Sequence, residues 1–157
     1  MRGALLALAL VVLAAPAQAG LNPIEFFRGR THGEGVLKVI FQASKRISVD
    51  SLGSTEKDGS VLLKQTIHEP DKPVRVRYWR LRQTGPNRFD GTLTDADSPV
   101  RVDVVGERVR IRYHGKDKLR FDQWLTQVGP REVRNSMRVK RLGITVARFE
   151  ETIRKLD

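Results

Sequence analysis

The side chains that could hold a ligand are aromatic, basic or amide groups, and they are Arg77, Tyr78, Trp79, Tyr113, Trp124 and Asn135. Aromatic rings with a few placed polar groups are typical of small-molecule pockets, although each ring also suits an ordinary core. A guanidinium favours an anionic group, and an amide on an apolar strand face needs hydrogen-bond partners. These residue types predict a binding site for a small molecule.

Catalytic and metal-binding patterns are not found in this sequence. The three histidines, His32, His68 and His114, are far apart and lack the spacing of metal ligands. Glu150 and Glu151 are adjacent, so on a strand they point to opposite faces and do not form a catalytic pair. No nucleophile elbow, phosphate-binding loop or dinucleotide fingerprint is present. We therefore predict no enzyme activity, no cofactor and no metal site.

The clearest strand is residues 74–82, VRVRYWRLR, which alternates apolar and basic side chains. Its phase changes in the middle, because Trp79 falls on the face of Arg77 and not on the face of Val76. A β-bulge would restore one apolar face, and a long barrel strand serving two environments would also explain the change. The functional alternative is that Arg77 or Arg80 points inward toward an acidic group of a ligand. An inward arginine would need such a partner, because a buried unpaired charge is costly.

Strands of this kind follow one another at short intervals, separated by Gly, Pro and Asp turns. The pattern predicts an all-β fold, an antiparallel up-and-down β-barrel of about ten strands. A short helix precedes them, because Asn22 can cap a helix and Pro23 suits its first turn. Phe26 and Phe27 are then expected to close one end of the barrel. The glycines of the GRTHGEG stretch predict either a positive φ or a close approach of the backbone to a neighbour.

The N-terminal residues 1–19 have the form of a signal peptide. A positive charge precedes an apolar run at residues 4–15, which is too short to span a bilayer, and Ala17–Ala19 provides a small-residue cleavage site. We expect cleavage between Ala19 and Gly20, which leaves residues 20–157 as a single domain. This leader favours export to a bacterial periplasm, with a soluble mature chain.

The formal net charge is +11, and the chain has no cysteine. Disulfides, thiol catalysis and lipidation at cysteine are therefore excluded. The basic residues are spread over nearly every strand, which predicts an Arg-rich outer face and anionic partners such as an envelope surface. Export to the envelope argues against nucleic acid as a partner.

An ordered set of short motifs resembles an uncharacterised bacterial family of exported small proteins, a domain-of-unknown-function group with a lipocalin-like barrel. The motifs are Phe26-Phe27-x-Gly29 followed by Gly33 and Gly35, Arg77-x-Trp79-Arg80-Leu81, Phe89-Asp90-Gly91-Thr92 followed by Asp95, Gly106 with Tyr113, Asp122-x-Trp124, and Asn135 with Lys140 and Gly143. Glu107 and Ser136 stand where the family favours Asn and Arg, and the Gly-x-Trp of true lipocalins is replaced by Gly33-Glu34-Gly35. The resemblance implies the barrel and the envelope setting, and it implies no reaction.

Three functions are compatible with these features. The leading hypothesis is a periplasmic, non-enzymatic barrel that binds a hydrophobic or amphipathic small molecule such as a lipid. The alternative is an envelope structural or interaction protein that docks on anionic surfaces through its Arg-rich outer face. An enzyme of the cyclase or isomerase type that uses the barrel interior ranks lowest.

Overall fold

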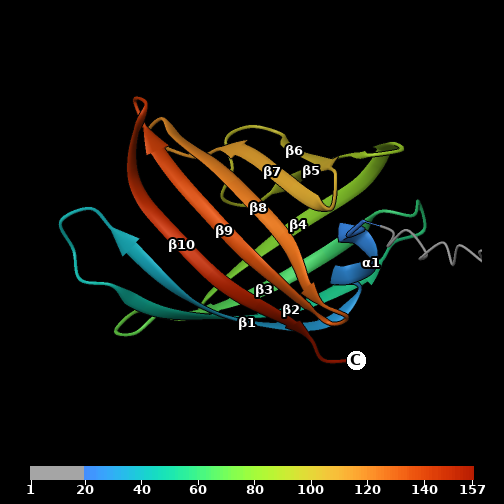
Figure 1. Ribbon diagram of the computed structural model, residues 1–157, viewed down its shortest axis with the longest axis horizontal. Helices are drawn as coiled ribbons and strands as arrows, with labels where there is room; N and C mark the ends of the chain where they lie inside the picture. Colours follow the sequence, from blue (N-terminus) through green and yellow to red (C-terminus); the bar gives the residue numbers. More distant parts are fainter. Residues whose placement is uncertain (1–19) are drawn as a thin grey trace, which may run out of the picture.

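The computed structural model describes residues 20–157, and the expected signal peptide lies outside this part of the chain. Ten antiparallel strands form a closed barrel in which each strand pairs with its neighbour in sequence and β1 pairs with β10 (Figure 1). The predicted fold class is therefore confirmed. Within residues 20–157 no helix has the length and apolar character needed to cross a membrane. The elements are α1 Pro23–Phe27, β1 Gly29–Val39, β2 Lys45–Thr55, β3 Val61–His68, β4 Arg75–Gly85, β5 Arg88–Leu93, β6 Val100–Val105, β7 Arg108–His114, β8 Leu119–Gly129, β9 Glu132–Arg141 and β10 Ile144–Lys155.

Alternation along each strand separates an apolar interior from a charged exterior. On β3, for example, Val61, Leu63 and Ile67 are buried while Lys64 and His68 are exposed. The same period holds around the barrel, so side chains of neighbouring strands form continuous inward rows. The core therefore lies inside the barrel, and most of the basic side chains lie outside it.

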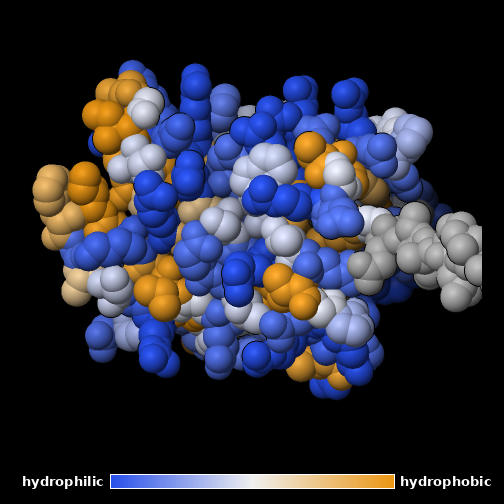
Figure 2. All heavy atoms as spheres, viewed as in Figure 1, coloured by the Kyte–Doolittle hydropathy of each residue, from blue (hydrophilic) through white to orange (hydrophobic). Residues whose placement is uncertain are grey.

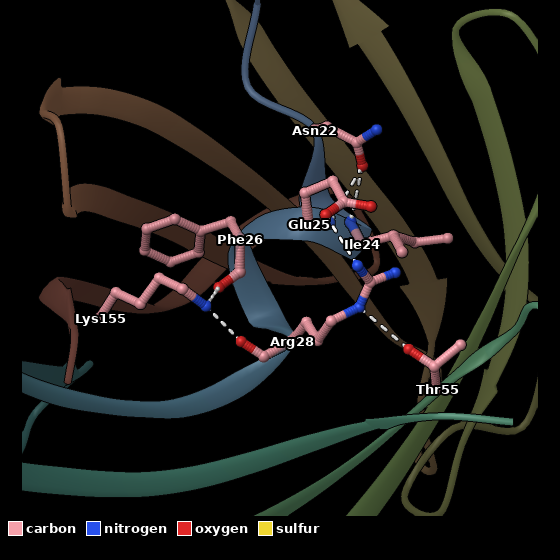
Figure 3. Close-up of polar contacts among 7 residues, drawn as sticks. All are labelled: Asn22, Ile24, Glu25, Phe26, Arg28, Thr55 and Lys155. Atoms are coloured by element: carbon pink, nitrogen blue, oxygen red, sulfur yellow. Dashed lines mark hydrogen bonds and ion pairs between the residues drawn. The ribbon is translucent and has the colours of Figure 1, made fainter. Parts of the chain in front are cut away.

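One end of the barrel is closed by α1, which lies across the strand ends at the right of Figure 1. Asn22 Oδ1 accepts hydrogen bonds from the backbone N–H groups of Ile24, at 3.0 Å, and Glu25, at 3.3 Å, which confirms the predicted cap (Figure 3). Phe26 and Phe27 are buried, with ring centroids 5.1 Å apart in an edge-on arrangement. The prediction that these two rings close one end is confirmed.

The end of α1 is fastened to the strands on both sides (Figure 3). Arg28 Nε donates to Thr55 Oγ1 on β2 at 2.9 Å. Lys155 Nζ on β10 donates to the carbonyl oxygen of Phe26 at 3.2 Å and also to that of Arg28. The helix is therefore held in place by contacts from β2 and β10 as well as by its buried rings.

The opposite end has no such plug in the described part of the chain. Inward-facing side chains near α1 are almost fully buried, as Val102, Leu125 and Val133 show. Toward the other end the inward-facing side chains keep partial exposure, and these are Leu37, Ile47, Arg77, Phe121, Gln123, Met137 and Ala147. This open end is therefore less completely covered than the end closed by α1.

Candidate functional site

The candidate site is built on β4, where the change of phase predicted from the sequence is resolved without a bulge. Pairing with β3 is unbroken from Ile67 opposite Arg75 to Val61 opposite Leu81, and the irregularity of β4 lies later, between Gln83 and Gly85. A bulge at the phase change is therefore wrong. Regular alternation instead places Arg77 on the inward face, and Arg80 stays outside.

Arg77 belongs to a polar row that crosses three neighbouring strands inside the barrel. Ser51 on β2, Gln65 on β3 and Arg77 on β4 lie opposite one another in the sheet register. Gln65 Oε1 accepts from Arg77 Nε at 2.8 Å and from Trp79 Nε1 at 2.7 Å, and Gln65 Nε2 donates to Ser51 Oγ at 3.3 Å. These bonds fix the position of the guanidinium through its Nε, and the Tyr113 hydroxyl is a further hydrogen-bond neighbour.

The charge of Arg77 is poorly compensated. Burial lowers the pKa of Arg77, while the nearby Tyr113, Asp95 and Glu151 act in the opposite direction. Among residues 20–157 no carboxylate lies within ion-pair distance of this guanidinium, whereas its neighbour Arg75 on β4 pairs with Asp95 at 2.9 Å. A cation in such surroundings favours an incoming anion.

A buried carboxylate faces the same interior from β10. Glu151 is buried and accepts a hydrogen bond from Asn135 Nδ2 on β9 at 2.8 Å. Gly33 on β1 leaves the space that this side chain fills, because a Cβ at Gly33 would lie 2.8 Å from Glu151 Cδ. The predicted close approach at the GRTHGEG glycines is therefore confirmed.

Two buried side-chain oxygens have no hydrogen-bond partner within the described residues: Asn135 Oδ1, on the amide that binds this carboxylate, and Thr31 Oγ1 on β1. Buried polar atoms are normally paired with protein or ordered water. Burial raises the pKa of Glu151, while the hydrogen bond from Asn135 and the charges of Arg77 and His32 lower it. The interior thus holds unused hydrogen-bonding capacity next to a carboxylate that is more readily protonated than usual.

Aromatic rings form the wall next to Arg77. The Trp79 and Tyr113 rings meet edge to face with centroids 5.7 Å apart, and Tyr113 stacks on Phe121 at 4.6 Å. The Arg77 guanidinium carbon lies 5.4 Å from the centre of the Trp79 ring. Burial raises the pKa of Tyr113, which keeps its hydroxyl protonated and able to donate. This set offers hydrogen-bond donors beside apolar ring surface.

The other two aromatic candidates lie on the outer face. Tyr78 is 45% exposed, because it alternates with the inward Trp79. Trp124 lies under the guanidinium groups of Arg108, at 4.3 Å, and Arg110, at 5.1 Å. Of the six residues predicted from the sequence, the structure therefore brings Arg77, Trp79, Tyr113 and Asn135 to the interior, and it places Tyr78 and Trp124 outside.

The histidines contribute to the outer surface and not to this site. His32 Nδ1 lies 2.7 Å from Asp50 Oδ1, and His68 Nε2 lies 3.4 Å from Asp50 Oδ2. The hydrogen bond to Asp50 raises the pKa of His32. No group of His, Asp and Glu side chains in the described residues has the geometry to hold a metal ion.

Sequence reasoning missed Gln65, Ser51 and Glu151. The signal that identified Asn135, a polar residue in an apolar inward row, was present for two of them. Gln65 stands between Leu63 and Ile67 on β3, and Glu151 stands at the same period between apolar residues on β10. Ser51 was missed for a different reason. Its place opposite Gln65 depends on the pairing register of β2 and β3, which a polar residue in an apolar row does not reveal.

The coupling between Arg77 and Glu151 predicts a measurable titration. We expect Arg77→Gln to raise the pKa of Glu151 further, because the guanidinium charge lowers that pKa in the parent protein. Carbon NMR of the Glu151 carboxyl would follow the change.

Since the folded-state pKa of Glu151 is raised, protonation favours folding, and stability is gained as the pH falls from that pKa toward the usual glutamate value. The outer control Arg80→Gln should leave the titration of Glu151 unchanged. An equally unchanged titration of Glu151 in Arg77→Gln would disprove the coupling.

Solved structures show that this barrel is a known fold. The S-type phycobiliprotein lyase CPES from Guillardia theta matches with a TM-score of 0.70 and 7% identity, over 85% of this chain and 90% of that one. A protein of unknown function from the DUF3598 family of Nostoc punctiforme matches with a TM-score of 0.64 and 12% identity, over 88% of this chain and 51% of that one. At these identities the likeness concerns the fold alone.

Sequence comparison identifies the family. A comparison with curated proteins gives no match. Residues 12–155 match the family described as "Protein of unknown function (DUF3833)". That range covers nearly all of the chain, including every strand of the barrel. The chain therefore belongs to the DUF3833 family.

Proposed function

We propose that the barrel binds an amphipathic small molecule with an acidic head group, such as a lipid carboxylate, and that the head group pairs with Arg77. The observation that carries this proposal is the inward guanidinium, fixed by Gln65 at 2.8 Å and without a carboxylate partner among residues 20–157. An anion at its terminal nitrogens would form charge-assisted hydrogen bonds where an uncompensated charge now stands. Tyr113 is placed to donate a further hydrogen bond.

The apolar part of the ligand would lie toward the open end. There the partly exposed inward side chains are mainly apolar, and they include Leu37, Ile47, Phe121 and Met137. Burying such surface is favourable by about 25 cal/mol per Å². A head group at Arg77 and a tail toward the open end would therefore satisfy both kinds of surface.

The proposed setting is the periplasm, after removal of the leader predicted at residues 1–19. The proposed activity is binding and not catalysis. Fold likeness to a phycobiliprotein lyase is compatible with a barrel that handles a small molecule, and the residues inside this barrel support the proposal independently of that likeness. The interior combines one cation, several donors and apolar walls, which is the composition expected of a binding pocket.

A pair of probes that differ only in the head group tests the proposal. We expect the parent protein to bind a long-chain fatty acid more tightly than the matching long-chain alcohol. Arg77→Gln should lower fatty-acid affinity about tenfold or more and leave alcohol affinity nearly unchanged, because only the charge-assisted bond is lost. Isothermal titration calorimetry measures both affinities.

Arg80→Gln is the matched control, because Arg80 lies on the outer face of the same strand and pairs with Glu56 at 3.0 Å. It removes one positive charge from the protein without changing the interior. Equal loss of fatty-acid binding in Arg77→Gln and Arg80→Gln would show a non-specific charge effect. Equal binding of acid and alcohol by the parent would contradict the proposed head-group site.

A further inference from the structure

Two hairpins from adjoining strands project at the open end of the barrel, at the left of Figure 1, and their tips point apart. One connects β1 to β2 through residues 40–44, and the other connects β9 to β10 through residues 142–143. They are neighbours because β1 pairs with β10, and the backbone N–H of Ile40 donates to the carbonyl oxygen of Val146 at 2.9 Å. The two tips therefore extend from adjoining strands at the same end of the barrel.

Bulky apolar side chains gather on these two tips. Phe41 is 98% exposed, Leu142 76%, Ile144 65% and Ile40 43%, and we call these four residues the apolar tips. Figure 2 shows two separate hydrophobic groups at the end of the molecule where these hairpins project, each next to hydrophilic side chains. Single exposed apolar residues are common, but four on two adjoining projections mark an interaction surface.

The backbone makes these residue types more unusual. Phe41 has φ of 62° and Leu142 has φ of 50°, which is the left-handed region. Bulky side chains are disfavoured there, and glycine or asparagine is the ordinary choice for a turn. Both positions therefore combine an unfavourable backbone with an unfavourable exposure to water. Such combinations occur where the side chain serves a function.

Within the two hairpins that carry the apolar tips, the charged side chains have one sign. Residues 36–46 and 137–149 contain no Asp or Glu. Their basic residues are Lys38, Lys45, Arg46, Arg138, Lys140, Arg141 and Arg148. Lys45 pairs with Glu69 at 3.4 Å, and the other six form no ion pair within residues 20–157. This charge is complementary to a surface rich in anionic groups.

We propose that the apolar tips insert into the interface of an anionic phospholipid membrane while the surrounding Lys and Arg side chains contact the head groups. Apolar groups at a polar boundary with basic residues around them are the known composition of interfacial membrane anchors. The tips are projections and not a groove, which suits a fluid lipid surface better than a shaped protein partner. Docking in this orientation turns the open end of the barrel toward the lipid. The inference does not depend on ligand binding at Arg77.

A single-cysteine label tests the insertion directly, since the chain contains no cysteine. Phe41→Cys carries an environment-sensitive NBD label at the tip. Lys57→Cys carries the same label in the exposed β2–β3 turn at the closed end. Proteins recovered from cells that express the full-length sequence are mixed with vesicles of phosphatidylglycerol and phosphatidylcholine. We expect a blue shift and a rise in fluorescence at position 41 only, and a loss of the response in high salt.

A second variant keeps the test independent of labelling. Phe41→Asn with Leu142→Asn removes the two largest exposed groups and suits the left-handed backbone, so thermal unfolding should be unchanged or shifted upward. Vesicle binding by flotation should fall by about tenfold or more. Undiminished binding by the double variant, or equal responses at positions 41 and 57, would overturn the proposal. A change from dimer to monomer in the double variant, without vesicle binding by the parent, would assign the tips to self-association and also overturn it.

Discussion

Gly53→Ala is expected to lower the free energy of unfolding by about 3 kcal/mol, because it forces a side chain into the backbone of α1. A Cβ at Gly53 would lie 2.8 Å from the carbonyl carbon of Phe27 and 3.3 Å from Arg28 Cα. The neighbour is backbone and not a flexible side chain, so it has no rotamer through which to move away. The contacts from Thr55 and Lys155 hold this end of α1 in place, as Figure 3 shows.

Chemical denaturation measures this effect, and Gly85→Ala is its control. A Cβ at Gly85 would make its nearest contact with Arg88 Cβ at 3.7 Å, which is ordinary packing, so we expect a change within about 0.5 kcal/mol. Similar stabilities of Gly53→Ala and the parent protein would show that α1 is loosely attached. In that case the closed end of the barrel would not be rigid.

Trp79→Ala is expected to cost about 3–5 kcal/mol of stability, the usual range for deleting a buried aromatic ring. Trp79 is only 5% exposed, packs against Tyr113 and donates to Gln65 at 2.7 Å. Its removal leaves a cavity and also frees the amide that positions Arg77. Weakened ligand binding in this variant would therefore follow in part from a less ordered interior.

Trp124→Ala is the matched comparison, because this ring lies outside under Arg108 and Arg110. Losing exposed cation–π contacts is expected to cost about 1 kcal/mol or less. Thermal or chemical unfolding of the two variants separates the roles. Comparable losses of stability in the two variants would contradict the assignment of Trp79 to the interior and Trp124 to the outer face.

Local patterns predicted much of the fold. Alternation at period two, with Gly, Pro and Asp turns, was sufficient for an up-and-down barrel, because each strand pairs with its neighbour in sequence. The start of α1 was also predicted, because the capping side chain of Asn22 and the first-turn position of Pro23 are both local signals. The sequence left open whether Arg77 points inward or a bulge changes the phase of the strand. The unbroken pairing of β4 with β3 shows that Arg77 points inward.

Contacts between distant segments were beyond these patterns. Glu151 fills the space above Gly33 because of the register in which β1 pairs with β10, and the alternation on either strand does not specify that register. Tyr78 and Trp124 were grouped with Trp79 by residue type, whereas strand phase places them on the other face. The apolar tips were missed because exposure at a turn depends on how two hairpins adjoin.

The central claim is that the barrel carries an acidic amphiphile at Arg77, and mass spectrometry of the protein purified from its producing cells tests it most directly. Native spectra followed by solvent extraction would be compared for the parent, Arg77→Gln and Arg80→Gln. We predict a stoichiometric ligand with an acidic head group and an apolar tail in the parent and in Arg80→Gln, and its loss from Arg77→Gln. A neutral ligand, an equal load on Arg77→Gln, or a parent protein without any bound molecule would contradict the account.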